Sequence, residues 1–109
     1  MADATLDPEK MKSSAARACR LMRVLSNPDR LLLLCQLARE EKRVGELQDD
    51  LGILQPTLSQ QLTVLRDEAL VTTRRDGKNI YYQIASPQAL AVMNVLFHQF
   101  CVQQAGATP

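Results

Sequence analysis

The chain has 109 residues, of which 13 are Lys or Arg and 12 are Asp or Glu, so its formal net charge is only +1. This length predicts a single domain over residues 1–109. No apolar run approaches the length that crosses a bilayer, and the N-terminus lacks a signal peptide's apolar stretch, so we expect a cytoplasmic protein without membrane association. A nearly neutral chain supports nucleic-acid binding only weakly, and that function has to rest on local patterns.

Two helices are predicted in the N-terminal third. The first covers residues 8–24, with Asp7 as its cap and Pro8 at its first position, where a missing N–H costs nothing. The second covers residues 28–39 with Asn27 as its cap, and its sequence LLLLCQL is apolar nearly all round, so we expect it to lie deep in the core. The first helix carries an apolar stripe that would let another helix approach closely: Ala15, Ala18, Cys19, Met22 and Leu25.

The middle of the chain has the pattern of a helix-turn-helix. A short helix places Val44, Leu47 and Leu51 inward, and Gly52 can supply the left-handed residue that ends it. Pro56 is then expected at the first position of the next helix.

In that next helix Leu58, Leu62 and Leu65 recur at helical spacing and predict its buried side. The other faces carry short amide and hydroxyl side chains, which can donate and accept at base edges in the major groove of DNA. We therefore predict DNA contacts by Gln55, Thr57, Ser59, Gln60 and Thr63. The pattern leaves open whether Leu54, just before them, contacts DNA or packs inward.

A β-hairpin is predicted next, with a strand over residues 71–75, the turn Asp76-Gly77 and a second strand over residues 79–85. Its basic side chains suit phosphate or minor-groove contacts, which position a protein on DNA. These predicted contacts are Arg74, Arg75 and Lys78. Helices followed by such a hairpin predict a winged helix-turn-helix, mainly α with a β-hairpin wing, and hence a DNA-binding regulator.

The last helix is predicted over residues 87–104, with Ser86 as its cap. Its apolar residues cover more than one face, so part of its surface is left after packing on its own domain: Leu90, Met93, Val95, Leu96, Phe97, Phe100 and Cys101. We expect the first and last helices to form the interface of a homodimer. A two-fold dimer places its two recognition helices about one turn of DNA apart, roughly 34–36 Å.

Three stretches resemble the ArsR/SmtB family of small bacterial winged-helix repressors: LSNPDRLLLLCQL, VGELQDDLGILQPTLSQQLTVLRDEALV and TTRRDGKNIYYQI. They extend over most of the chain. The resemblance implies a homodimer whose protomer has four helices, the two-stranded wing and a fifth helix in that order. It also implies a repressor that binds double-stranded operator DNA, expected to be an imperfect inverted repeat, until an inducer binds or reacts.

Metal-sensing members of this family place thiolates in the helix before the recognition helix, or His and carboxylate ligands on the last helix. Here the first of these reads VGELQDDL, without cysteine, and His98 has no second histidine to pair with. Zinc and arsenic-type sites need three or four soft or imidazole ligands. We therefore expect no metal and no cofactor, although Cys19, Cys35 and Cys101 together would supply three thiolates.

Cys35 and Cys101 resemble the cysteine pair of the persulfide-sensing branch, which includes biofilm-growth-associated repressors and repressors of sulfide-oxidation genes. The local matches are LSNPDRLLLLCQL and FHQFC. The resemblance implies that a small reactive sulfur species, hydrogen persulfide or an organic persulfide, links the two thiols by a chain of sulfurs and lowers DNA affinity. It implies nothing for Cys19.

Other interpretations stay open at this point. Cysteine is among the most buried residue types, so Cys35 in its leucine run also fits a core residue. His98, one turn before Cys101, is either a surface or interface residue or a group that favours the Cys101 thiolate. The alternative function is a general thiol-redox or metal(loid)-responsive repressor of the same fold.

Two further classes fit the sequence less well. An enzyme would need a nucleophile with its base, a phosphate loop or paired carboxylates with a pocket signature, and the sequence has none of these, so we expect no catalytic activity. A winged helix that binds proteins instead of DNA would not need the Gln/Thr/Ser face or the basic hairpin, and this chain has both.

Overall fold

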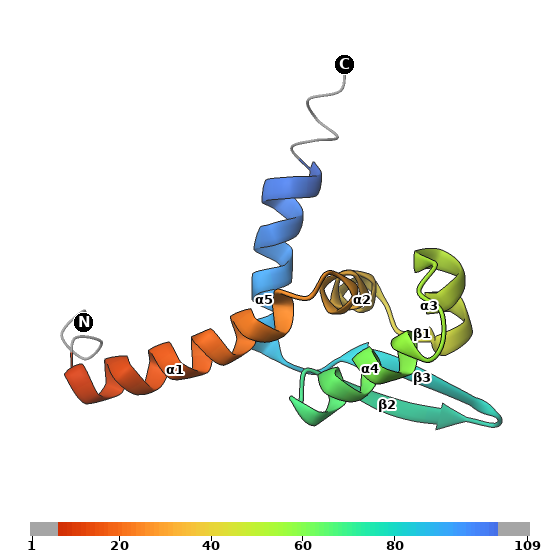
Figure 1. Cartoon of the computed structure of the whole chain (residues 1–109), viewed down its shortest axis with the longest axis horizontal. Helices are drawn as coiled ribbons and strands as arrows, with labels where there is room; N and C mark the ends of the chain where they lie inside the picture. The colour runs from red at the N-terminus through yellow and green to blue at the C-terminus, as the bar shows by residue number, and fades with distance from the viewer. Residues whose placement is uncertain (1–6, 103–109) are drawn as a thin grey trace, which may run out of the picture.

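The computed structural model describes residues 7–102, apart from the side chain of residue 102. The elements in chain order are α1 (Pro8–Leu25), α2 (Pro28–Arg39), β1 (Lys42–Arg43), α3 (Val44–Leu51), α4 (Thr57–Asp67), β2 (Val71–Asp76), β3 (Asn79–Ile84), α5 (Pro87–Leu96) and the π-helix η2 (Phe97–Val102). In Figure 1, α1 and α5 project in different directions from the rest of the molecule. We call α1 and α5–η2 the arms, and α2, α3, α4 and the three strands the reading module.

Three helices begin at the caps predicted from the sequence. The side-chain oxygens of Asp7, Asn27 and Ser86 each accept a hydrogen bond of 3.0 Å from a backbone N–H in the first turn. A proline follows each cap, where its fixed φ suits the helix and its missing N–H is not needed. The predicted bounds of α2 are confirmed, and α1 continues one residue further than predicted, to Leu25.

The core lies between α2, α3, α4 and the start of the wing, and the inner residues of α1 and α5 complete it: Val24, Leu25, Ala89 and Met93. Its fully buried side chains are Leu33, Leu34, Leu37, Leu47, Leu58, Leu62, Leu65 and Met93. Burying a leucine contributes about 1.5–3 kcal/mol, so this cluster dominates the stability of the reading module. The prediction that α2 lies deep in the core holds for one side of the helix only, because another side is left uncovered: Leu32 is exposed, and Leu31 and Cys35 are only half-buried.

The wing is part of a three-stranded antiparallel sheet with the order β1-β3-β2. Strand β1 pairs Lys42 with Tyr82 and Arg43 with Tyr81, and it was not predicted because two charged residues give no strand pattern. The predicted turn Asp76-Gly77 was wrong by one residue. Asp76 pairs with Asn79 at the end of the ladder, so the turn residues are Gly77, with φ +65°, and Lys78.

Helix α4 also begins one residue later than predicted, at Thr57. Pro56 is its N-cap, after a cis Gln55–Pro56 bond, and the Pro56 carbonyl accepts the first-turn hydrogen bond from the backbone N–H of Gln60. The end of α3 follows the prediction, since Gly52 is left-handed with φ +70°. The winged helix-turn-helix predicted from the sequence is thus confirmed, with local shifts at its turns.

The arms leave apolar side chains exposed. Met22 of α1 and Val95 of α5 are each 58% exposed, and Phe100 of η2 is 69% exposed. The prediction of one last helix over residues 87–104 was wrong within the described part, because α5 ends at Leu96 and a π-helical turn continues the chain; residues 103 and 104 lie outside the described residues. No helix in residues 7–102 combines the length and apolar character needed to cross a membrane.

Candidate DNA-binding surface and thiol pocket

The N-terminus of α4 is organised by Gln55. Its side-chain oxygen accepts hydrogen bonds from the Ser59 hydroxyl (2.6 Å) and the Ser59 backbone N–H (3.2 Å). The Thr63 hydroxyl donates to the Ser59 backbone carbonyl at 2.9 Å. These contacts satisfy a helix end that Pro56 cannot cap with a side chain. Sequence reasoning treated Gln55 only as a DNA contact and missed this capping role.

The other predicted contacts of α4 lie opposite its buried leucines. Ser59, Gln60 and Thr63 are exposed, and Thr57 is half-buried. Within residues 7–102 the Gln60 side chain makes no hydrogen bond, so its amide is available to a partner. Leu54 is 65% exposed, which shows that it does not pack into the core.

Arg30 fixes the position of α4 relative to α1 and α2. Its guanidinium donates to the Val24 carbonyl (2.8 Å), the Arg23 carbonyl (3.3 Å) and the side-chain oxygen of Gln61 (3.0 Å). One side chain thereby satisfies the end of α1 and holds α4. No sequence pattern indicated this role, because Arg30 and Gln61 are 31 residues apart.

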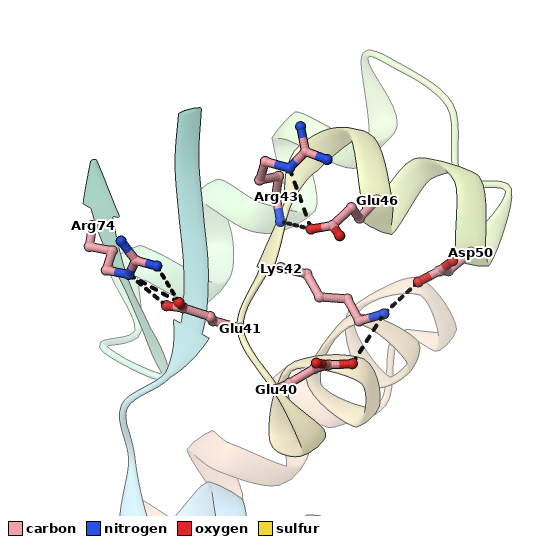
Figure 2. Close-up of polar contacts among 7 residues, drawn as sticks. All are labelled: Glu40, Glu41, Lys42, Arg43, Glu46, Asp50 and Arg74. Carbon is pink, nitrogen blue, oxygen red and sulfur yellow. Dashed lines mark hydrogen bonds and ion pairs between the residues drawn. The ribbon is translucent and has the colours of Figure 1, made fainter. Parts of the chain in front are cut away.

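The three predicted cations of the wing differ in their surroundings. Arg74 pairs with Glu41 and lies over the ring of Tyr81 (Figure 2 shows the ion pair). In contrast, Arg75 and Lys78 are exposed, and neither makes an ion pair or side-chain hydrogen bond within residues 7–102. The structure therefore brings all three to the wing but leaves only two of them free of protein partners.

A charged segment between α2 and α3 holds β1 in place. Figure 2 shows the Lys42 ammonium between the Asp50 carboxylate, at 2.7 Å, and the Glu40 carboxylate, at 3.9 Å. The hydrogen bond from Lys42 to Asp50 raises the pKa of the ammonium. Nearby, the backbone N–H of Arg43 donates to the Glu46 carboxylate at 2.9 Å. These contacts were not foreseen from the sequence.

The two cysteines singled out by the sequence are close in space, one on α2 and the other on η2. Burial raises the pKa of the Cys35 thiol, the charge of the nearby Cys101 thiolate raises it further, and Arg39 lowers it. A pocket of about 240 Å³ lies beside Cys35, lined also by Ala38, Arg39, Met93, Asn94 and Phe97. Cys35 is half-buried and Cys101 exposed, and both are free thiols.

The two remaining candidates are Cys19 and His98. Cys19 is an exposed free thiol on α1. The imidazole of His98 meets the Phe97 ring edge-on, with 6.2 Å between ring centroids. Within residues 7–102 no group of three or more His, Cys, Asp or Glu side chains is placed to hold a metal ion.

Residues 27–73 match the family model described as bacterial regulatory protein, arsR family. The chain is 45% identical over 96 residues to a biofilm growth-associated repressor of Xylella fastidiosa, covering 88% of this chain and 84% of that protein. The chain belongs to the ArsR family. This membership confirms the resemblance read from the sequence and identifies the chain as a DNA-binding transcriptional regulator, not an enzyme.

Solved structures show the same fold. The transcriptional repressor BigR from Xylella fastidiosa is 44% identical, with a TM-score of 0.80, over 88% of this chain and 98% of that chain. A homodimeric winged helix-turn-helix DNA-binding domain from Mycobacterium bovis is 28% identical, with a TM-score of 0.68, over 80% of this chain and 81% of that chain.

Proposed function

We propose that this ArsR-family protein is a cytoplasmic homodimeric repressor that leaves its operator when a persulfide links Cys35 to Cys101 through a chain of sulfurs. The observation that carries the proposal is that Cys35 lines a pocket together with Phe97, the first residue of η2, and Cys101 lies one turn further along η2. The charge on Cys101 accordingly acts on the pKa of Cys35. The similarity to biofilm growth-associated repressors supports repression.

The chemistry needs no oxidant beyond the persulfide. Each thiolate attacks the outer sulfur of a persulfide RSSH and becomes a cysteine persulfide, releasing RSH. One cysteine persulfide then attacks the inner sulfur of the other and expels hydrogen sulfide, which leaves a trisulfide. Two thiols and two RSSH thus give one trisulfide, two RSH and one hydrogen sulfide. A disulfide needs Cα atoms within about 4.4–6.8 Å, whereas a trisulfide spans a wider gap.

The position of α2 connects this pocket with the DNA-reading surface. Cys35 is on α2, which packs against α4, β3 and α5. A sulfur bridge would tie α2 to η2 in one arm and strain the arrangement of the arms. A strain of about 1.4 kcal/mol is enough to lower DNA affinity tenfold.

The dimer is proposed from the exposed arms and from the homodimeric relative. In it, two copies of α4 would enter successive major grooves of an imperfect inverted repeat. Gln55, Thr57, Ser59, Gln60 and Thr63 are the proposed contacts from α4. Gln60 has the freest amide, whereas the Gln55 oxygen is already bonded to Ser59. Arg75 and Lys78 are the proposed phosphate contacts of the wing, whereas Arg74 is paired with Glu41.

The switch is tested with Cys35→Ser and Cys101→Ser proteins on operator DNA. Each should bind like reduced wild type and fail to dissociate after glutathione persulfide, because a bridge needs both ends. Cys19→Ser is the matched control and should dissociate normally. Intact mass of the wild type should show one added sulfur and two lost hydrogens, and reductant should restore binding.

Three outcomes would point elsewhere. If Cys35→Ser still dissociates normally, Cys35 is a core residue and the bridge is not the switch. Release by peroxide or arsenite as readily as by persulfide would favour the general thiol-redox or metal(loid) sensor. Equal affinity of the reduced wild type for operator and random DNA would refute specific reading altogether.

The DNA contacts are tested separately. Gln60→Ala should weaken the free energy of binding to the operator by about 1–3 kcal/mol and to random DNA only little, if its amide reads a base. Arg75→Gln should weaken binding to both and lower the salt slope by about one, as loss of a phosphate contact does.

A further inference from the structure

The outer face of the wing sheet carries a row of three cross-strand neighbours. Arg43 of β1 and Arg74 of β2 both lie opposite Tyr81 of the central strand β3. Directly paired residues point to the same face of an antiparallel sheet. The opposite face, with Tyr82 and Ile84, packs against the core. Arg74 therefore lies on the side of the sheet turned away from the core.

The Arg74 guanidinium is bound from two sides. Its Nε donates to both carboxylate oxygens of Glu41, at 2.9 and 3.1 Å, and its Nη2 also donates to Glu41. Its Cζ atom lies 4.5 Å from the centre of the Tyr81 ring, a cation–π distance. These bonds lower the pKa of the Glu41 carboxyl, so the pair is charged at neutral pH.

The Glu41–Arg74 pair joins the two edges of the sheet. Glu41 directly precedes β1 at one edge and Arg74 belongs to β2 at the other, with Tyr81 between them on β3. Figure 2 shows the two charged groups turned toward each other. A two-stranded ribbon is marginally stable by itself, and β1 adds only two residues of pairing to this one. The pair is thus an additional tie between the wing and the segment that follows α2.

We propose that Glu41, Arg74 and Tyr81 form a clamp that sets the orientation of the wing on DNA, with Glu41 and Arg74 acting as positioning residues and Arg75 as the phosphate contact. This deepens the proposed function, because it assumes that the wing touches the operator. The proposal gives different roles to the adjacent Arg74 and Arg75, which were both predicted from the sequence as DNA contacts. The Glu41 carboxylate takes the Nε–H and one Nη2–H of the five Arg74 donors and neutralises its charge, whereas Arg75 keeps all five donors and an unpaired charge within the described part of the chain.

Glu41→Gln gives the decisive test, because loss of a negative charge and loss of the clamp predict opposite changes in operator affinity. Removing a negative charge beside a DNA-binding surface strengthens binding when nothing else changes. Loss of the clamp should instead weaken operator binding by about threefold to fivefold, the range of a partly exposed ion pair. Glu40→Gln is the matched control. It removes the same charge one residue away, from a carboxylate whose closest cation is 3.9 Å distant, and should bind as wild type or slightly tighter.

Fluorescence anisotropy on operator DNA at several salt concentrations measures these effects with reduced protein. Arg74→Gln should weaken binding with the salt slope unchanged, whereas Arg75→Gln lowers the slope by about one. The charge swap Glu41→Arg/Arg74→Glu should recover at least half of the affinity lost in Arg74→Gln, because the pair is rebuilt in reverse. Amide NMR spectra of each variant check that the fold is retained.

The clamp is overturned if Glu41→Gln binds as tightly as Glu40→Gln, or if Arg74→Gln lowers the salt slope as Arg75→Gln does. A charge swap that binds no better than Arg74→Gln would also refute it. These results differ from failure of the proposed function, in which the wild type itself would not prefer operator to random DNA.

Discussion

The reading module buries a cluster of leucines, whereas the arms leave several large apolar side chains exposed. In the module, leucines such as Leu58 of α4 and Leu47 of α3 are fully buried, although Leu32 and Ile80 are exposed. On the arms, Met22, Val95 and Phe100 stay exposed in one protomer. Large exposed apolar patches mark interaction sites in soluble proteins. The core is thus closed within one chain, with help from the inner residues of the arms, while the outer apolar side chains of the arms are left for the proposed partner copy.

The largest expected effect comes from the module. Leu58→Ala should lower the free energy of unfolding by about 2–5 kcal/mol, because it leaves a cavity in a fully buried cluster. Phe100→Ala on the arm should act through the dimer, so its loss of unfolding free energy should shrink as the protein is diluted and vanish once the wild type is itself monomeric. Urea unfolding at two protein concentrations separates the two behaviours. A concentration-independent loss of the same size in Phe100→Ala would break the comparison.

A charge on an arm should affect assembly more than folding. Val95→Glu should raise the dissociation constant of the dimer at least about 100-fold, or about 2.7 kcal/mol, since an unpaired carboxylate would be buried in the interface. Leu54→Glu is the matched control, because Leu54 is similarly exposed but lies in the reading module. Sedimentation should show monomer for the first and dimer for the second. A monomeric wild type at micromolar concentration would contradict the role given to the arms.

Removing a helix cap should also destabilise the module more than an arm, although by a smaller free energy. Asn27→Ala should lower the free energy of unfolding by about 1 kcal/mol, because Asn27 caps α2 at the centre of the fold. Asp7→Ala removes an equivalent hydrogen bond at the exposed start of α1. There the first turn can fray while the core stays intact, so the cost should be under about 0.5 kcal/mol. Equal costs in urea unfolding would mean that α1 folds as one unit with the module.

The smallest expected effect is the change in the pKa of Cys35 at the thiol pocket, where the module meets an arm. Burial, and then the Cys101 thiolate, raise the pKa of Cys35, so the folded state favours the neutral thiol. The resulting stability is present below the unfolded pKa and is lost as the pH rises through the folded one. Iodoacetamide labelling of Cys35 in folded Cys19→Ser protein should therefore have its midpoint at higher pH than in urea.

Cys101→Ser should bring this midpoint down only part of the way, because burial is the larger cause. Arg39→Gln should move it up, since Arg39 favours the thiolate. A folded midpoint below the unfolded one would show that the pocket activates Cys35 instead.

Much of the fold could be predicted because its signals are local. The caps at Asp7, Asn27 and Ser86 and the left-handed Gly52 lie within a few residues of the groups they satisfy. The leucine spacing of α4 repeats every turn, and it correctly predicted the buried side. Two of the errors were single-residue shifts, at Pro56 and at the wing turn, where neighbouring registers have similar local energies.

Contacts between distant segments needed the tertiary structure. Strand β1 exists because β3 pairs with it, and Glu41 meets Arg74 across 33 residues, so neither left a periodic signal. For the thiols, family resemblance had picked out Cys35 and Cys101, but their proximity depends on how η2 continues α5 beside α2. Local hydrogen bonding and side-chain periodicity can be predicted from the sequence, because they involve residues that are close together along the chain. Which charges and thiols meet is decided by packing, because it depends on surfaces that form only when the helices and the sheet come together.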